Sequence, residues 1–375
     1  MRIHLEITGK CNLNCIYCYN SRFNKKSEIK KELKTLDWIQ IIKEANFLKC
    51  RRFTISGGEP LLNNDLEKIL TTCGSPIILF TNATLLSFEK LEKIKKIKQL
   101  KAFRISLDGI NAHNKYRLPS KSLEIVDKIK LIKNTNIGVG INTQFSEKIC
   151  EEIIDFYKLL KELKINYWSI DFPFFSGKYN EKNNSYNQAI FNKIINTCGD
   201  LIKIYLDDGR PFNLKISNIY NSQIHDTTYG NFNPNKHPCC YEDIITVRPN
   251  GDLTVCPAYS LFLSNIKKEG SLEKAIKRAR NNSFYKLGAG DIENCKNCRY
   301  FKLCGSGCRG DAVFLTNKKL GVDPISCSFW PLVEKYIFPI LPKKDKKKME
   351  DSLNNKGDLP RVFSSIKKIQ EFYKT

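Results

Sequence analysis

The sequence contains no run of about twenty apolar residues, the length that a helix needs to cross a membrane. It also starts on the strand-like Ile3–Ile7, without the charged and then apolar leader of an exported protein. We therefore expect no membrane span and a location in a reducing cytoplasm. In such a compartment, disulfide bonds are a poor explanation for the 15 cysteines among the 375 residues.

Acidic residues are few relative to basic ones, and the formal net charge is +23. The lysines are spread over most segments with helical periodicity, so we interpret the charge as a solvated surface and expect no nucleic-acid partner. The one concentrated run lies between Pro342 and Lys348. It predicts either a mobile basic arm or a docking site for an acidic peptide, and apolar spacing in Val362–Tyr373 predicts a helix after it.

Cysteine is abundant, and its spacing is informative. Three cysteines lie close together in the segment CNLNCIYC: Cys11, Cys15 and Cys18. A 4Fe-4S cluster is usually held by four cysteines, so three of them leave one iron for another molecule to coordinate. A zinc site would need a fourth Cys or His, and His4 is the only histidine nearby. The pattern therefore favours an iron-sulfur cluster over zinc.

The C-x3-C-x2-C spacing, with Ile3–Ile7 before it and Tyr19 after it, resembles the signature of the radical SAM superfamily. The resemblance implies that the open iron binds the amino and carboxylate groups of S-adenosylmethionine (SAM). It also implies that one electron from the cluster cleaves SAM to a 5'-deoxyadenosyl radical, which the protein positions and shields from water.

Later segments resemble the SAM-binding loops of the same superfamily. In FTISGGEP, two glycines allow a close approach of the backbone, and Glu59 can accept a hydrogen bond from an ammonium group. Thr81-Asn82-Ala83 resembles a TNG turn, but alanine takes a positive φ less freely than glycine. The resemblance implies these cofactor-binding residues: Tyr17, Gly57, Gly58, Glu59, Thr81, Asn82, Ser106 and Asn142.

Phe103–Gly109 resembles the SLDG strand of the superfamily. In that strand the serine contacts the cofactor ribose and the aspartate, here Asp108, faces the substrate. His113 and Arg117 follow at the spacing SLDG-x3-H-x3-R. These three residues are the candidate catalytic residues, and a structural role for each is the alternative.

Apolar strands alternate with segments of helical periodicity along the first half of the chain. Strands are expected at 3–7, 53–56, 77–80, 103–107, 137–144 and 167–175, and helices at 36–48, 62–70, 123–132 and 149–163. This alternation predicts an α/β fold with a parallel sheet. Six such units resemble the partial (β/α)6 TIM-like barrel of the superfamily, in which the site lies at the carboxyl ends of the strands.

A second cysteine array occupies the C-terminal third. Cys240 precedes Gly251 and Cys256, and the run C-x2-C-x5-C-x3-C over 295–308 is followed by Cys327. The array resembles the SPASM extension of radical SAM enzymes, a small α+β domain with two auxiliary 4Fe-4S clusters. A treble-clef zinc fold would explain only part of this pattern. The resemblance thus implies three clusters in all.

The resemblance also implies a ligand set for each auxiliary cluster. Cys295, Cys298, Cys304 and Cys327 would hold the cluster farther from the substrate, and Cys240, Cys256 and Cys308 would hold the nearer one. Cys239 is a candidate fourth ligand, although neighbouring side chains on an extended segment point to opposite faces. The alternative is an open iron. The remaining cysteines are expected to be small buried side chains.

We expect a radical SAM barrel over 1–215, a SPASM domain over 216–340, and a basic linker with a C-terminal helix over 341–375. The first boundary lies near Asp207–Pro211, a sequence typical of a helix end and a turn.

The leading hypothesis is an enzyme that abstracts a hydrogen atom from a peptide or small protein, giving a cross-link, an epimerised residue or an oxidised side chain. Flavodoxin or ferredoxin would supply the electron. Because no peptide-docking domain precedes the barrel, we expect either a separate peptide-docking protein or a substrate without a leader. Pro257, where sulfatase maturases are expected to have an aspartate, disfavours that activity. The alternatives are a small-molecule substrate, such as a tetrapyrrole or quinone precursor, and an electron-transfer protein without turnover.

Overall fold

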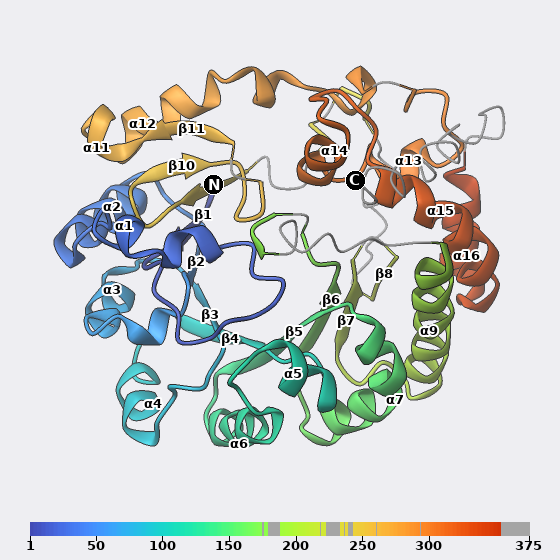
Figure 1. The fold of residues 1–375 in the computed structure, drawn as a ribbon, viewed down its shortest axis with the longest axis horizontal. Coiled ribbons are helices and arrows are strands. Elements are labelled where there is room, and N and C mark those ends of the chain that lie inside the picture. Colours follow the sequence, from blue (N-terminus) through green and yellow to red (C-terminus); the bar gives the residue numbers. More distant parts are fainter. Residues whose placement is uncertain are drawn as a thin grey trace.

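Parallel strands alternating with helices form a curved sheet in the computed structural model (Figure 1). It describes residues 1–174, 176–178, 188–217, 219–222, 233–235, 237–238, 243–259, 261–292 and 294–353. Seven parallel strands are neighbours in chain order: β1 (Arg2–Glu6), β2 (Arg52–Ser56), β3 (Ile77–Thr81), β4 (Leu100–Ser106), β5 (Gly138–Gln144), β6 (Tyr167–Asp171) and β7 (Asn213–Ile216). The predicted α/β class and partial barrel are confirmed.

Helices surround the outside of the sheet (Figure 1). They are α2 (Thr35–Phe47), α3 (Leu66–Thr72), α4 (Phe88–Ile94), α6 (Ser122–Lys133), α7 (Glu147–Glu162) and α9 (Gln188–Asp207), while the short α1 (Lys26–Ile29) and α5 (Asn111–Tyr116) lie in connections. In α7, Ser146 caps the first turn by accepting a hydrogen bond from the Ile149 amide, and buried residues recur at three- and four-residue spacing. The predicted helix at 149–163 is thus confirmed.

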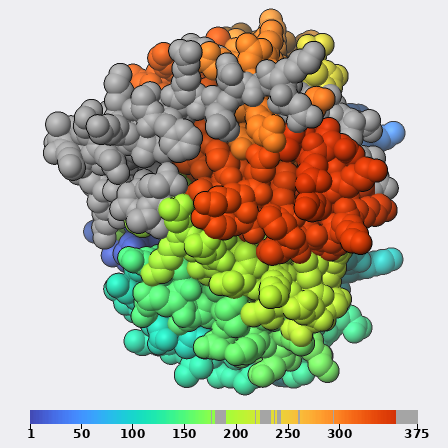
Figure 2. Space-filling model, turned by 90° about the vertical axis from the view of Figure 1, so that its right-hand side faces the viewer, coloured from blue at the N-terminus to red at the C-terminus, as the bar shows by residue number. Residues whose placement is uncertain are grey.

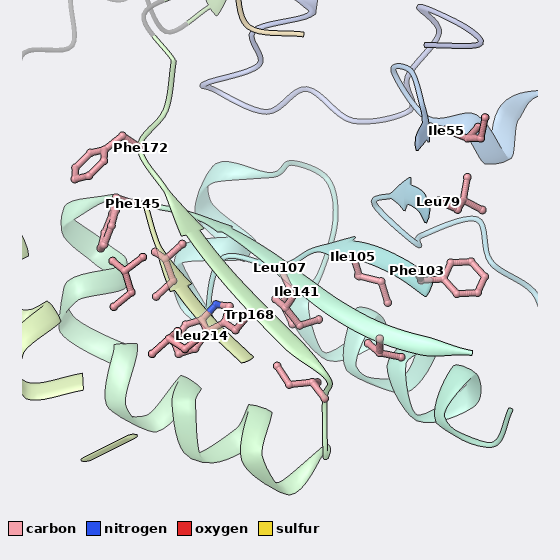
Figure 3. Close-up of a cluster of buried hydrophobic side chains, with 14 of the residues drawn as sticks. Ile55, Leu79, Phe103, Ile105, Leu107, Ile141, Phe145, Trp168, Phe172 and Leu214 are labelled. Atoms are coloured by element: carbon pink, nitrogen blue, oxygen red, sulfur yellow. The ribbon is translucent and has the colours of Figure 1, made fainter. Parts of the chain in front are cut away.

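The two faces of each strand differ in polarity. On the outer face, apolar side chains such as Phe103, Ile141 and Trp168 are fully buried between the sheet and its helices (Figure 3). Because side chains alternate along a strand, neighbours such as Arg104 and Asn142 face the interior of the barrel. The interior therefore carries many polar side chains, together with Ile78 and Phe80 of β3, whereas the outer layer forms the hydrophobic core.

The sheet extends beyond the six predicted strands. On one side, β8 (Tyr220–Asn221) pairs antiparallel with β7; on the other, β9 (Ile244–Val247) pairs parallel with β1, and β10 (Asp252–Thr254) and β11 (Phe262–Asn265) follow antiparallel. One 11-stranded sheet therefore includes segments on both sides of residue 215. The three predicted domain ranges stay predictions, and the sheet continues through the first boundary.

The C-terminal segments cover the open side of the barrel (Figure 1). They contain α11 (Ile266–Glu269), α12 (Leu272–Arg280), α13 (Phe301–Cys304), α14 (Arg309–Thr316), α15 (Pro324–Tyr336) and α16 (Lys343–Asp351). Phe329 of α15 lies 4.5 Å from the ring centre of Phe172 and 4.9 Å from that of Phe191 on α9. Figure 2 shows the segments of α15 and α16 packed directly above α9. This region is thus anchored to the barrel at β1 and at α9.

The lysine run after Pro342 is helical. It forms α16, where Met349 is buried and Asp345 forms an ion pair with Arg210 at 3.3 Å. The prediction of a mobile arm is wrong for 343–351, because the helix packs one side against the rest of the chain. The predicted helix at Val362–Tyr373 lies outside the described residues. Among the described residues, no helix is long and apolar enough to span a membrane.

Candidate functional site

The loop after β1, residues 7–20, carries the first three cysteines, and we call it the cluster loop. Backbone bonds hold it on two sides. The amides of Gly58 and Glu59 donate to the carbonyls of Thr8 and Lys10 at 2.7 and 2.8 Å. Opposite them, the cluster-loop amides of residues 14 and 16 donate to the carbonyls of residues 118 and 116 at 2.8 and 3.1 Å. The cysteines are therefore presented on a loop whose position two other strand ends determine.

Gly57 and Gly58 allow the GGEP turn to touch the cluster loop. A Cβ atom at Gly57 would lie 2.4 Å from the carbonyl oxygen of Thr8, and one at Gly58 would lie 2.3 Å from that of Lys10. Both distances are too short for any side chain. The predicted close backbone approach is present, and its partner is the chain's own loop. Cofactor binding by these glycines stays a prediction.

Glu59 is fully buried beneath this turn. Its Oε1 accepts hydrogen bonds from Thr81 Oγ1 at 2.7 Å and from the Leu61 amide at 3.0 Å, and its Oε2 accepts one from the Asn82 amide at 2.7 Å. Burial raises the pKa of Glu59 to about 7, against the effect of these donors. Glu59 thus ties the GGEP turn to the turn after β3, and its predicted bond to an ammonium group stays untested.

The turn after β3 also contacts the cluster loop. The Asn82 side chain donates to Asn12 Oδ1 at 3.0 Å, and Asn12 in turn donates to Thr84 Oγ1 at 2.8 Å. Ala83 adopts a left-handed φ of +61°, with its amide donating to Thr81 Oγ1 at 2.9 Å. Alanine therefore takes the glycine conformation despite its lower freedom there, at a cost of about 1 kcal/mol.

Asp108 and Arg117 form a buried ion pair. Arg117 Nε donates to Asp108 Oδ2 at 2.6 Å and a terminal nitrogen donates to Oδ1 at 3.1 Å, while the Gln144 amide also donates to Oδ1 at 2.9 Å. Burial by itself would lower the pKa of Arg117. The charges of Asp108 and Cys15 raise it by more, so the pKa of Arg117 lies above its usual value. The pair thus connects the end of β4 to the cluster loop. A catalytic role for either residue stays a prediction.

His113 is buried behind this pair. Its Nδ1 accepts a hydrogen bond from the Asp108 amide at 3.4 Å, which leaves Nε2 to donate to Ser120 Oγ at 2.9 Å. Burial and the charge of Arg117 lower the pKa of His113 to about 3. A neutral histidine with both nitrogens bonded supports the turn, and its catalytic role is likewise untested.

A polar row lies along the carboxyl ends of the inner strands. Ser106 on β4 is opposite Asn142 on β5, which is opposite Ser169 on β6, and Ser169 is opposite Lys215 on β7. The motifs predicted only the first two residues of this row. Ser169 and Lys215 were missed, although the alternation of side chains along β6 and β7 could have placed them on the same face.

Several buried polar atoms near these loops have no hydrogen-bond partner among the described residues, among them Asn142 Oδ1, the Tyr17 hydroxyl and Asn20 Nδ2. Buried polar atoms are normally paired, so Asn142 and Tyr17 are suited to a bound ligand. Tyr17 lies under the Arg117 guanidinium, whose carbon is 5.3 Å from the ring centre. The residues present therefore fit a polar cofactor such as SAM beside the three thiols.

The second cysteine array brings four thiols to one pocket. Its lining includes Cys295, Cys298, Cys304 and Cys327, together with Asp323 and Trp330. This is the set that the SPASM resemblance assigns to one cluster. In the part of the chain that is described, no three His, Cys, Asp or Glu side chains lie close enough to hold a single metal ion. Four thiols that line one pocket could hold a 4Fe-4S cluster, and this ligand set stays a prediction.

Two of the other predicted ligands lie near each other. Burial raises the pKa of Cys308, and Cys256 interacts with it electrostatically. The Cys308 amide donates to Asp323 Oδ2 at 2.8 Å, so Asp323 lies between this cysteine and the four-thiol pocket. Cys239 and Cys240 lie outside the described residues. The ligand set of the nearer cluster therefore stays a prediction.

Solved structures share this architecture. anSMEcpe with bound AdoMet superposes with a TM-score of 0.71 at 20% identity, covering 93% of this chain and 98% of that one. SuiB of Streptococcus suis, bound to the precursor peptide SuiA, gives a TM-score of 0.66 at 17% identity over 86% of this chain and 74% of that one. At such identities the likeness concerns the fold, a partial barrel with a C-terminal region.

Sequence relatives identify the family. The sequence model of the Radical SAM superfamily matches residues 5–183. An uncharacterised protein of Methanocaldococcus jannaschii is 31% identical over 210 residues, 52% of this chain and 70% of that protein. The AdoMet-dependent heme synthase of Methanosarcina barkeri is 31% identical over 164 residues, 42% of this chain and 46% of that enzyme. This chain belongs to the radical SAM superfamily.

Proposed function

We propose that this protein is a radical SAM enzyme of the SPASM type that removes a hydrogen atom from a peptide or small protein. The observation that carries the proposal is the grouping of four thiols around one pocket, in a region packed against the barrel that holds the cluster loop. A SAM-cleaving site alone does not require a second cysteine array. Auxiliary clusters give that array a function.

The residues of the first site divide into ligands and supports. Cys11, Cys15 and Cys18 would hold a 4Fe-4S cluster, which with SAM supplies a 5'-deoxyadenosyl radical. Asn142 and Tyr17 offer unpaired polar atoms to SAM. Glu59, Asp108 and His113 are already bonded within the chain, so they would keep the cluster loop in place and exclude water.

The second site would handle the electron that remains after hydrogen abstraction. An auxiliary cluster held there would supply an acceptor for one electron from a substrate radical, and a base would take the proton. Cys295, Cys298, Cys304 and Cys327 would hold one auxiliary cluster, and Cys256 and Cys308, with Cys240 and either Cys239 or an open position, would hold the other. Flavodoxin or ferredoxin would reduce the cluster at Cys11, Cys15 and Cys18. A separate protein would present the peptide. Both would act in a reducing cytoplasm.

The relatives support two substrate classes. Both structural neighbours include crystals with peptides, anSMEcpe with the Kp18Cys peptide and SuiB with SuiA. Sequence matches favour small molecules instead, since they include the heme synthase and the GTP 3',8-cyclase of Clostridium botulinum, which is 28% identical over 55% of this chain and 66% of that enzyme. We favour the peptide because those structural likenesses extend over the second cysteine array.

Anaerobic reconstitution tests the proposal. The protein is loaded with iron and sulfide, reduced with dithionite, and given SAM with short peptides encoded near its gene, or with GTP or a tetrapyrrole precursor. About twelve irons, 5'-deoxyadenosine stimulated by a peptide, and a mass shift in that peptide are expected. If only a small molecule stimulated the formation of 5'-deoxyadenosine, the substrate would be that small molecule and not a peptide. If the protein bound its full complement of iron but formed no 5'-deoxyadenosine, the remaining interpretation would be an electron-transfer protein.

A further inference from the structure

A buried ion pair joins the end of β1, which the cluster loop follows, to the end of β9. Glu6 ends β1, and Arg248 directly follows β9. The two strands run parallel with Leu5 opposite Val247, so the next residues lie side by side. Arg248 donates to Glu6 Oε2 at 2.7 Å, and both side chains are almost fully buried. The pair therefore sits where the cluster loop leaves the sheet, while Cys256 follows the next strand of the hairpin, β10.

The Arg248 guanidinium uses its full hydrogen-bonding capacity there. It has five N–H groups, and the structure offers five acceptors for them. These are Thr254 Oγ1 at 3.2 Å, Glu6 Oε2 at 2.7 Å, Asn20 Oδ1 at 3.5 Å, the Cys256 carbonyl at 3.3 Å and the Pro257 carbonyl at 2.6 Å. One side chain thus binds the backbone of a predicted auxiliary-cluster ligand and the end of the cluster loop.

Glu6 makes the matching contact on the other side. The Tyr19 hydroxyl, one residue beyond Cys18, donates to Glu6 Oε1 at 3.3 Å. The Phe23 ring covers the Arg248 guanidinium, whose carbon is 5.4 Å from the ring centre. The network therefore reaches from the segment after Cys18 to the Cys256 carbonyl without an exposed link.

Strand pairing alone does not account for this arrangement. Buried ion pairs often contribute no more to stability than well-packed apolar residues would. At the other end of the same strands, partly exposed ion pairs already join Asp243, which precedes β9, to Arg2 on β1 and to Arg51, which precedes β2. What Arg248 adds is a set of directed bonds to Cys256 and Pro257, with a fixed charge beside them.

We propose that Glu6 and Arg248 are positioning residues that hold the Cys256 loop against the cluster loop and set the reduction potential of the nearer auxiliary cluster. The inference rests on the proposed function, because it takes Cys256 as a cluster ligand. A positive charge and N–H donors near a cluster favour its reduced, more negative state. Loss of Arg248 should lower the potential, and loss of the Glu6 charge should raise it.

A redox titration followed by EPR spectroscopy tests this. The full-length reconstituted protein is compared with Arg248→Met, Glu6→Gln and Arg248→Lys. EPR signals that persist when Cys11, Cys15 and Cys18 are all replaced by Ala are assigned to auxiliary clusters. Asp243→Asn is the matched control, since it breaks the ion pairs with Arg2 and Arg51 at the opposite strand ends. It should leave the auxiliary potentials unchanged.

Opposite shifts for Arg248→Met and Glu6→Gln at unchanged iron content, with Arg248→Lys closer to the unaltered protein, are the expected result. Shifts of the same sign, or none, would leave only a structural ion pair and overturn the inference. If Arg248→Met fails to fold, Glu6→Gln still tests the inference, because the reduction potential of the auxiliary cluster must rise in that variant. No iron in the triple-alanine protein would instead refute the proposed auxiliary clusters themselves.

Discussion

Most polar side chains of the candidate site bind other residues of the chain rather than facing an empty space. Glu59 accepts three hydrogen bonds, Asp108 is paired with Arg117, and His113 is bonded at both nitrogens. Such fully bonded groups hold turns in place. The atoms left for a ligand are fewer, and they include Asn142 Oδ1 and the Tyr17 hydroxyl.

Glu59 predicts a pH dependence of stability. Its pKa rises from 4.5 to about 7 because burial disfavours the carboxylate. Between these values the folded chain keeps a proton that the unfolded chain releases, so stability should fall by roughly 3 kcal/mol as pH rises from about 4.5 to above 7. Glu59→Gln should flatten this part of the profile. Thermal unfolding of both reconstituted proteins from pH 5 to 8 measures it, and parallel profiles would contradict the assignment.

Ala83 predicts a stabilising substitution. Its φ of +61° is strained for alanine but not for glycine. Ala83→Gly should therefore increase the free energy of unfolding by up to about 1 kcal/mol. Ala112, which is buried in α5, is the matched control, because Ala112→Gly should lose about 1 kcal/mol. Denaturant unfolding compares the two variants. A loss at both positions would mean that the turn after β3 does not need the left-handed conformation.

At the scale of elements, three connections after neighbouring strands meet at the cluster loop. The turns after β2 and β3 and the segment following α5 all hydrogen-bond to it. Parallel strands bring these connections to one edge, as barrels of this type require. The position of the cysteines is thus a property of several connections and not of the loop alone.

Gly58 tests this dependence. Gly58→Ala would place a Cβ atom 2.3 Å from the Lys10 carbonyl oxygen, so the cluster loop must shift. We expect the loss of about four irons, those of the first cluster, while the auxiliary irons remain. Gly199→Ala is the control, because its Cβ would meet only ordinary contacts beyond 3.7 Å. Full iron content in Gly58→Ala would show that the loop tolerates the displacement.

At the scale of the whole molecule, the C-terminal region completes the barrel. It pairs β9 with β1 and packs α15 on α9, so the region that carries the second cysteine array is joined to the barrel by its sheet and by α9. The ion pair of Glu6 and Arg248 connects the segments that carry the two arrays, although these two residues are 242 positions apart in the sequence.

The two arrays should therefore be separable by function. Cys15→Ala should abolish SAM cleavage, because the first cluster loses a ligand. Cys304→Ala should keep 5'-deoxyadenosine formation and stop product formation, because its thiol lines the other pocket. Chromatography of deoxyadenosine and mass spectrometry of the substrate measure both steps. Normal product from Cys304→Ala would remove the auxiliary clusters from the mechanism.

Prediction from the sequence succeeded where the signal is local. The first six strands and the helices at 36–48, 123–132 and 149–163 were found within a few residues, because periodicity reports which face is buried. The strands β7 and β9 were missed. Each has four residues, too few for a clear pattern, and each becomes a strand by pairing with a distant neighbour.

Cysteine spacing was the most informative part of the sequence, because the family resemblance that it carries implied both the superfamily and the four residues that share one pocket. Ligand spacing within a short segment is set by the geometry of the group that it binds, so it can be read without the fold. The partners of Glu59, Asp108 and Arg248 were decided only by the tertiary structure. A buried polar group must find a partner, and which one is nearby depends on how distant strands are brought together.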